Sequence, residues 1–132
     1  AGCANVNNLG AVLIGLVSGV LVVYSINFLE KKGFDDAVGA VSVHGICGIW
    51  GVLAVAIFDT TDGLVYGGGA TLFLPQLIGI LAIGVWAYGT SFLVFKVIDS
   101  TVGLRVTAEE EIAGLDATEH GTSAYGDFIT KK

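Results

Sequence analysis

The sequence predicts an all-α, polytopic membrane protein, and three observations support this prediction. Hydrophobic residues make up 54% of the 132 residues, and charged residues make up only 14%. Glycine occurs 20 times and the mean hydropathy is +0.81, a profile typical of polytopic membrane helices and rare in soluble domains. Three apolar runs are each long enough to cross a bilayer as a helix.

The apolar runs that we expect to form transmembrane helices cover residues 9–29, 37–58 and 72–98. Each reaches the roughly 20 residues that span a hydrocarbon core of about 30 Å, and none shows the period of two that marks a strand. Pro75, the only proline, falls in the first turn of the third run, where a missing backbone N–H is tolerated. We therefore expect a transmembrane region over residues 1–102 and a polar tail over residues 103–132.

The positions of the basic residues predict an orientation in the membrane. Lysines lie in the loop 30–36 and, as Lys96, near the end of the third run. Residues 1–8 and 59–71 contain no lysine or arginine. Because basic residues are enriched on the cytoplasmic side of membrane proteins, we expect loop 30–36 and the tail to be cytoplasmic.

His44 is the candidate functional residue because it lies inside the second apolar run, where the thiol of Cys47 is the only other ionisable group. An ionisable side chain at bilayer depth is costly, faces the protein interior or a water path, and marks a functional site by default. A neutral imidazole donates one hydrogen bond and accepts another, which suits a proton relay or the guidance of a small polar molecule. The residues alone leave two interpretations open, a structural hydrogen-bonded histidine and a histidine on a substrate path.

A helical wheel centred on His44 separates small residues from large ones. The face of His44 carries Ala40, Val41, Cys47, Gly48, Gly51 and Val55. The opposite face carries Ile46, Ile49, Trp50, Leu53 and Ile57. A stripe of small residues permits the close approach of another helix or a narrow path beside the imidazole.

Other residues predict no further chemistry. Cys3 and Cys47 are too few for a disulfide framework, and the glycine triplet 67–69 lacks the lysine and the strand-to-helix context of a phosphate loop. No nucleophile groups with a base, no set of metal ligands is present, and no basic patch suggests nucleic acid. We therefore expect neither an enzyme nor a protein that binds a metal, a cofactor or nucleic acid.

Two separate blocks of the sequence carry a family resemblance. The first is the block 35–48, DDAVGAVSVHGICG, followed by Gly51. It is similar to the penultimate membrane helix of the ammonium transporter family, in its Amt branch. The tail resembles the family's cytoplasmic C-terminal region in order and spacing, through TVGLRV at 101–106, EEE at 109–111, GLD at 114–116 and the segment 120–125.

The resemblance implies that the chain is the C-terminal portion of a longer subunit, with the last three of eleven helices around a narrow hydrophobic pore. It implies transport of ammonium or ammonia across the plasma membrane by a homotrimer. His44 matches the second histidine of the family's twin-histidine pair, whose partner would lie upstream of Ala1. Where many members carry a further aspartate three residues after the Asp-Asp pair, this chain has Gly39.

Two alternatives use the same scaffold. A membrane ammonium sensor would carry a signalling domain beyond the tail, yet the chain ends at Lys132, shortly after the matched region. An Rh-type channel for ammonia or a gas is disfavoured because the match over 109–125 is to the Amt branch. We therefore expect transport.

Asp36 directly precedes the second apolar run and has two interpretations. As a helix cap at the cytoplasmic mouth, its carboxylate would accept backbone N–H groups and meet the positive end of the helix dipole. As a functional residue, it would take part in releasing the substrate at that mouth.

The tail contains the remaining candidate residues. Its composition alone allows a solvated, partly disordered segment, whereas the resemblance implies an ordered regulatory tail that packs under the subunits near the docking surface of a trimeric nitrogen-signalling regulator. The matched positions, which we expect to couple the subunits, are Gly114, Asp116, His120 and Tyr125. We expect His120 to be a surface hydrogen-bonding residue rather than a metal ligand.

Overall fold

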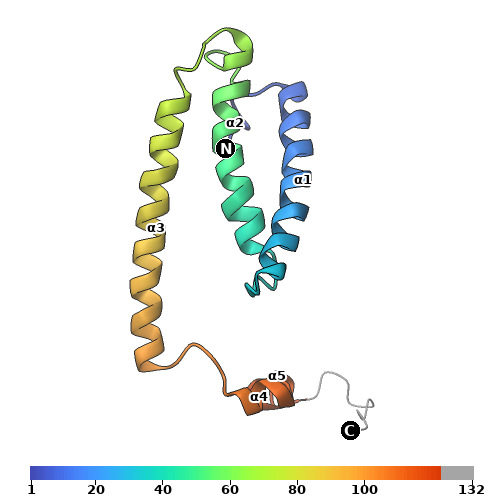
Figure 1. The fold of residues 1–132 in the computed structure, drawn as a ribbon, viewed down its shortest axis with the longest axis vertical. Coiled ribbons are helices and arrows are strands. Elements are labelled where there is room, and N and C mark those ends of the chain that lie inside the picture. The colour runs from blue at the N-terminus through green and yellow to red at the C-terminus, as the bar shows by residue number, and fades with distance from the viewer. Residues whose placement is uncertain (123–132) are drawn as a thin grey trace. The chain divides into compact units, whose positions relative to one another are not determined.

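The computed structural model describes residues 1–122, and within this range every regular element is a helix (Figure 1). Three helical segments in the described part are long and apolar enough to cross a membrane, namely Asn8–Lys31, Val41–Phe58 and Phe73–Thr101. The predicted all-α fold with several spanning helices is therefore confirmed. The chain divides into two compact units, Ala1–Trp86 and Ala87–Lys132, and α3 (Phe73–Thr101) continues from the first into the second.

The first helix, α1 (Asn8–Lys31), has a defined cap at each end. The side chain of Asn7 accepts a hydrogen bond from the backbone N–H of Gly10 at 2.9 Å, as an N-cap does. After Lys31 the chain reverses through Gly33, whose φ of 76° is a left-handed conformation that glycine adopts without strain. The helix thus contains the predicted run 9–29 and extends it at both ends.

The second span consists of two consecutive segments, a π-helical turn η1 (Val41–Ile46) and the helix α2 (Cys47–Phe58). It begins later than the expected position 37. The reason is a turn in which the N–H of Gly39 donates to the carbonyl of Asp36 at 2.9 Å, with Gly39 at a φ of 67°. This left-handed residue breaks the helix that hydropathy alone would start at Ala37.

The second span packs against α1, and the two lie side by side in Figure 1. The buried residues of this pair are small, which allows a close approach of the two backbones: Gly10, Ser25, Ser42, Ala54 and Ala56. Two side chains of α2 reach backbone carbonyls of α1. The indole nitrogen of Trp50 donates to Ile14 at 3.1 Å, and the thiol of Cys47 donates to Ser18 at 3.6 Å.

A hydrogen-bonded cluster, which we call the Asn5–Asp59 tie, joins the segment before α1 to the end of α2. The amide nitrogen of Asn5 donates to the carboxylate of Asp59 at 2.9 Å. The carbonyl of Asn5 accepts from both the backbone N–H and the hydroxyl of Thr60, at 2.9 and 3.1 Å. The other carboxylate oxygen of Asp59 accepts the N–H groups of Thr61 and Asp62 at 2.8 and 2.9 Å. Asp59, only 7% exposed, is the centre of the tie.

The connection from α2 to α3 is compact and includes the short 3-10 helix η2 (Leu64–Tyr66). The amide nitrogen of Asn7 donates to the hydroxyl of Tyr66 at 2.5 Å, so this loop also contacts the start of α1. A Cβ atom at Gly68 would collide with the backbone of Asp62. The central glycine of the triplet 67–69 is therefore required by the close passage of the chain.

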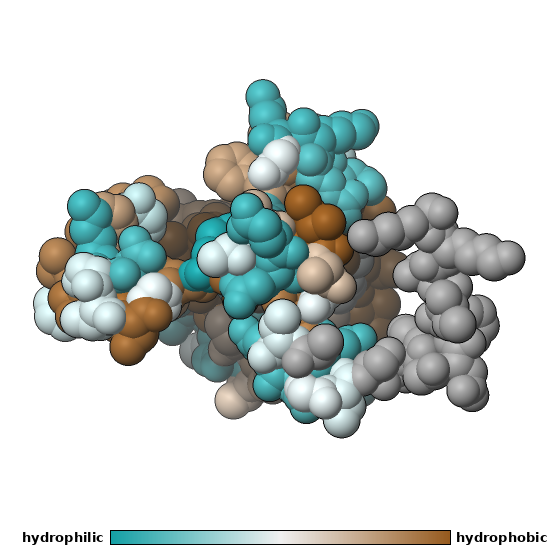
Figure 2. Space-filling view, turned by 90° about the horizontal axis from the view of Figure 1, so that it is seen from below, coloured by the Kyte–Doolittle hydropathy of each residue, from teal (hydrophilic) through white to brown (hydrophobic). Residues whose placement is uncertain are grey.

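The unit that follows contains the end of α3 and two short helices, α4 (Ala108–Ala113) and α5 (Leu115–Glu119). A capping box starts α4: the hydroxyl of Thr107 accepts from the N–H of Glu110, and the carboxylate of Glu110 accepts from the N–H of Thr107. The backbone N–H of Thr107 and its hydroxyl both donate to the carboxylate of Glu110 and lower its pKa. In the space-filling view from below, hydrophilic and hydrophobic residues are mixed on the visible surface (Figure 2).

The Asn5–Asp59 tie predicts a pH dependence of stability. Hydrogen bonds from the N–H of Asp62, the N–H of Thr61 and the side chain of Asn5 lower the pKa of Asp59 below its ordinary value of 3.8. Because the folded-state pKa is depressed, the contribution of Asp59 is fully present above the unfolded pKa and is lost as the pH falls through the folded pKa. We expect wild type to exceed Asp59→Asn in stability by a constant amount from pH 7 to 5, and by a shrinking amount below 3.8.

Unfolding of the full-length protein in detergent, followed from pH 7 down to about pH 3, measures this difference. Asp62→Asn is the matched control, because Asp62 takes part in the tie through its backbone N–H. A difference between wild type and Asp59→Asn that stayed constant across the whole range would contradict the prediction.

Candidate functional site

His44 lies in the π-helical turn η1, at the beginning of the second span. The π-helical pattern continues into the next residue, since the backbone N–H of Cys47 donates to the carbonyl of Ser42, five residues earlier. Single π turns inside α-helices are rare and occur frequently at functional sites. The sequence identified the histidine, but no hydropathy pattern indicated the π turn that holds it.

The surface around His44 is open in this chain. The side chain is exposed, although it belongs to an apolar span. A Cβ atom added at Gly48 would meet no atom within 4 Å, and one at Gly45 would meet only a methyl of Val41, at 3.8 Å. The imidazole therefore lies beside small residues and uncovered space, where a further helix or a small molecule fits.

Asp36 binds the first backbone groups of η1. Its two carboxylate oxygens lie 3.2 and 3.1 Å from the backbone nitrogen of Val41, and one of them lies 3.3 Å from that of Ser42. An ordinary N-cap side chain accepts from the N–H two or three residues later, whereas Asp36 reaches five and six residues ahead. The turn at Gly39 makes this possible because it folds the intervening residues out of the helix.

Two residues of the predicted wheel bond to α1. Cys47, which the wheel places on the face of His44, donates its thiol to the carbonyl of Ser18. A π turn accommodates about one more residue per turn, so positions after η1 are rotated relative to those before it. Trp50, which the wheel placed opposite His44, contacts α1 as well. The sequence pattern named both residues but did not indicate these bonds to α1.

Ser42 is a small residue of η1, the segment that packs against α1. It is fully buried, and within residues 1–122 its hydroxyl has no hydrogen-bond partner. A buried hydroxyl without a partner is unfavourable, so the close packing of the π turn has a cost. Ser25 on α1 is also buried, but its hydroxyl donates to its own helix, to the carbonyl of Val22 at 3.1 Å.

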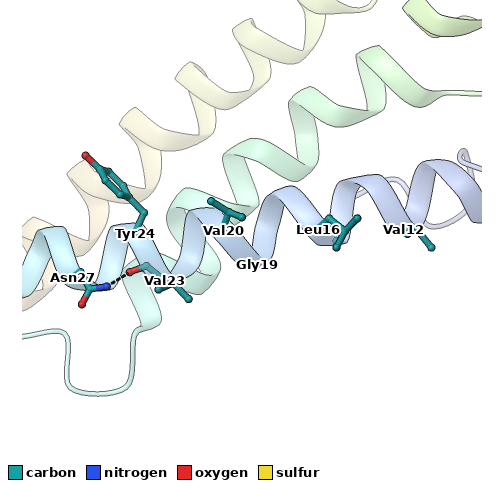
Figure 3. Close-up of a pocket in the computed structure, with 8 residues that line it drawn as sticks. Val12, Leu16, Gly19, Val20, Val23, Tyr24 and Asn27 are labelled. Atoms are coloured by element: carbon teal, nitrogen blue, oxygen red, sulfur yellow. Dashed lines mark hydrogen bonds between the residues drawn. The ribbon is translucent and has the colours of Figure 1, made fainter.

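A groove of about 820 Å³ follows one face of α1 (Figure 3). It is lined by Val12, Gly15, Leu16, Gly19, Val20, Val23, Tyr24 and Asn27. The side-chain amide of Asn27 donates to the carbonyl of Val23 at 2.9 Å, so it finds its hydrogen-bond acceptor in its own helix (Figure 3). The groove contains no carboxylate, imidazole or amine, and its glycines fit the packing of another helix.

The tail candidates lie at the corner between α4 and α5. Gly114 joins the two helices with φ 94° and ψ 142°, and its N–H donates to the carbonyl of Glu110 at 3.0 Å. The carbonyl of Asp116 accepts from the N–H groups of His120 and Thr122, both at 3.2 Å. The structure thus brings three of the four candidates into one corner, while Tyr125 lies outside the described residues.

No group of three histidine, cysteine, aspartate or glutamate side chains that could hold a metal ion is found among residues 1–122. The sequence model of the Ammonium Transporter Family matches residues 1–125. This chain belongs to the ammonium transporter family. The resemblance seen in the two sequence blocks is therefore confirmed, and family membership together with the apolar spans makes the chain part of an integral membrane protein.

Relatives from distant organisms align over nearly the whole chain. Ammonium transporter Amt2 of Archaeoglobus fulgidus is 39% identical over 98% of the chain, and the ammonium transporter of Bacillus subtilis is 39% identical over 90%. The chain spans only 30% and 31% of the lengths of these two relatives. The described helices therefore correspond to part of a larger family architecture.

The contacts of Asp36 predict how its substitution affects stability. Asp36→Ala removes the acceptor for the N–H groups of Val41 and Ser42, and we expect a loss of about 1 kcal/mol, the usual cost of a lost cap. Asp36→Asn keeps a side-chain oxygen and should cost clearly less. Unfolding of the full-length protein in mixed detergent micelles measures both. Equal losses for the two variants would show that the charge, rather than the acceptor, stabilises η1.

Proposed function

We propose that this chain forms the C-terminal part of a subunit that transports ammonium or ammonia across the membrane, with His44 on the substrate path. The observation that carries the proposal is the ionisable imidazole inside an apolar span, in a π turn and beside the small residues Gly45 and Gly48. An ionisable group at such a position is costly and is retained for a function. The names of the relatives, which are ammonium transporters, agree with this assignment.

The chemistry of the substrate explains why a histidine suits this place. Moving an intact ammonium ion into an apolar channel carries a large desolvation cost, whereas neutral ammonia tolerates desolvation far better. In the proposed mechanism, ammonium loses its proton near the outer end and ammonia passes beside the imidazole. The proton crosses by a route that includes His44, since imidazole can accept a proton on one nitrogen and release one from the other.

We also propose where this chain lies in the whole subunit and how the subunits assemble. The partner histidine of His44 and the remaining helices lie in the portion of the subunit that precedes this chain, and three subunits form a homotrimer in the plasma membrane. Loop 30–36 and the tail face the cytoplasm, which agrees with Lys31 and Lys32 at the end of α1.

Replacement of His44 tests the pore assignment. In the full-length subunit, we expect His44→Ala to lower the rate of uptake by about tenfold or more. A group that relays protons contributes at least that much to the rate. The measurement is saturable uptake of labelled methylammonium by cells without their own ammonium transporters. Val43→Ala, one residue away and 44% exposed, is the control for lost volume.

Two outcomes would count against the proposal. Wild-type uptake by a well-expressed His44→Ala protein would remove His44 from the substrate path. No uptake by the well-expressed wild-type trimer would instead favour a membrane sensor of ammonium on the same scaffold.

We further propose that the α4–α5 corner couples the subunits and lies near the docking surface of a trimeric nitrogen-signalling regulator. The capping box gives α4 a defined start despite its shortness. Ile112 is 89% exposed and Leu115 is 40% exposed, so the corner presents apolar side chains beside its acidic residues. An exposed apolar surface with a polar rim is typical of a protein contact.

The backbone of Gly114 makes this proposal testable. Its φ of 94° with ψ of 142° is accessible essentially to glycine alone, so Gly114→Ala should strain the corner by about 1–3 kcal/mol. We expect faster proteolysis of the tail and altered uptake in the full-length trimer, with the membrane region still folded. Glu119→Ala, at an ordinary backbone position in α5, is the control. A Gly114→Ala protein with wild-type proteolysis and uptake would contradict the proposed coupling.

A further inference from the structure

We propose that Trp50, together with Cys47, is a positioning residue for His44, because their hydrogen bonds to α1 fix the rotation of the helix that carries the imidazole. This inference rests on the proposed place of His44 on the substrate path. Neither residue needs to touch the substrate. Their role would be to hold the imidazole in the direction that the path requires.

The two hydrogen bonds form a matched pair between the helices. Trp50 donates to the carbonyl of Ile14 at 3.1 Å, and Cys47 donates to the carbonyl of Ser18 at 3.6 Å. The donors are three residues apart on α2, and the acceptors are four residues apart on α1, so each pair lies on one face of its helix. Two bonds at successive turns fix both the rotation and the axial position of α2 against α1, which a single contact cannot do.

The carbonyl of Ile14 accepts two side-chain donors. These are the indole N–H of Trp50 at 3.1 Å and the hydroxyl of Ser18 at 2.9 Å. In an apolar span, an indole N–H without an acceptor is costly, because no water replaces the lost partner. This cost confines Trp50 to orientations that reach Ile14 and thereby confines the helix that carries it.

The π turn makes the rotation of this helix important for His44. Cys47 follows η1 directly, and its backbone N–H donates to the carbonyl of Ser42 inside the turn. Asp36 holds the other end of η1 through Val41 and Ser42. If η1 relaxed into an α-helix, the register would change by one residue, which rotates His44 relative to α2 by about 100°. The bonds of Cys47 and Trp50 oppose this change because they fix α2 immediately beyond the turn.

The test replaces the indole donor and keeps an aromatic ring. We expect Trp50→Phe, in the full-length transporter, to change the KM for methylammonium by about threefold or more, normalised to the amount of folded trimer. A residue that only stabilises the fold would lower the number of active transporters and leave the KM unchanged. In a His44→Ala background the effect of Trp50→Phe should disappear, since the substitution acts through the histidine.

The chain offers a matched control and a second variant. Trp86→Phe makes the same chemical change on α3, at a tryptophan that is 73% exposed in this chain, and should leave the KM unchanged. Cys47→Ala removes the second donor, and we expect a smaller change in the same direction. It also keeps the inference testable if Trp50→Phe does not yield a folded trimer.

The outcomes separate this inference from the proposed function. Uptake that falls only in proportion to folded protein, with the KM unchanged in Trp50→Phe and Cys47→Ala, would overturn the positioning role alone. Equal effects of Trp50→Phe with His44 present or replaced would overturn it too. If His44→Ala itself transports as wild type does, the proposed function of His44 fails, and the positioning role falls with it.

Discussion

A span that crosses an apolar medium has no water to satisfy its polar groups, and the first two spans of this chain are organised by that constraint. Hydroxyl and amide side chains of α1 bond to carbonyls of their own helix, as Ser18, Ser25 and Asn27 do. The polar atoms of Trp50 and Cys47 bond to carbonyls of the neighbouring helix instead. The same requirement that makes these groups costly therefore turns them into specific contacts between helices. Among the buried side-chain polar atoms of these described spans, the hydroxyl of Ser42 in the π turn is the exception.

The spanning helices were predictable because their signal is composition over about 20 residues, which needs no knowledge of neighbours. The start of the second span was not, because Gly39 interrupts the helix with a left-handed turn inside the apolar run and Asp36 caps the segment that follows. The Asn5–Asp59 tie was also beyond the sequence pattern. Its two partners are separated by 54 positions, and nothing local distinguishes Asn5 from other polar residues near the beginning of the chain.

The candidate site, like the fold, was predictable from the sequence only in part. His44 stood out in the sequence because an ionisable residue in an apolar run is rare. The residues around it are assigned with a period of 3.6, which does not hold within a π turn, and no pattern in the sequence indicates the bonds that Cys47 and Trp50 make to α1. In the tail, Gly114 was selected through the resemblance, and the structure adds the positive φ that accounts for a glycine there. Tyr125 lies outside the described residues, so its part in the tail stays a prediction.

The Asn5–Asp59 tie has a consequence for how the helix pair meets membranes of different thickness. α1 contains 24 residues and the second span 18, so their lengths differ by roughly 9 Å at 1.5 Å per residue. The tie joins the start of α1 to the end of α2. The difference in length therefore falls at the other end of the pair, where the chain between Lys32 and Ala40 connects the two helices. Hydrophobic mismatch between the two helices and a bilayer is therefore taken up next to Asp36 and the turn that holds His44, rather than at the end that the tie fixes.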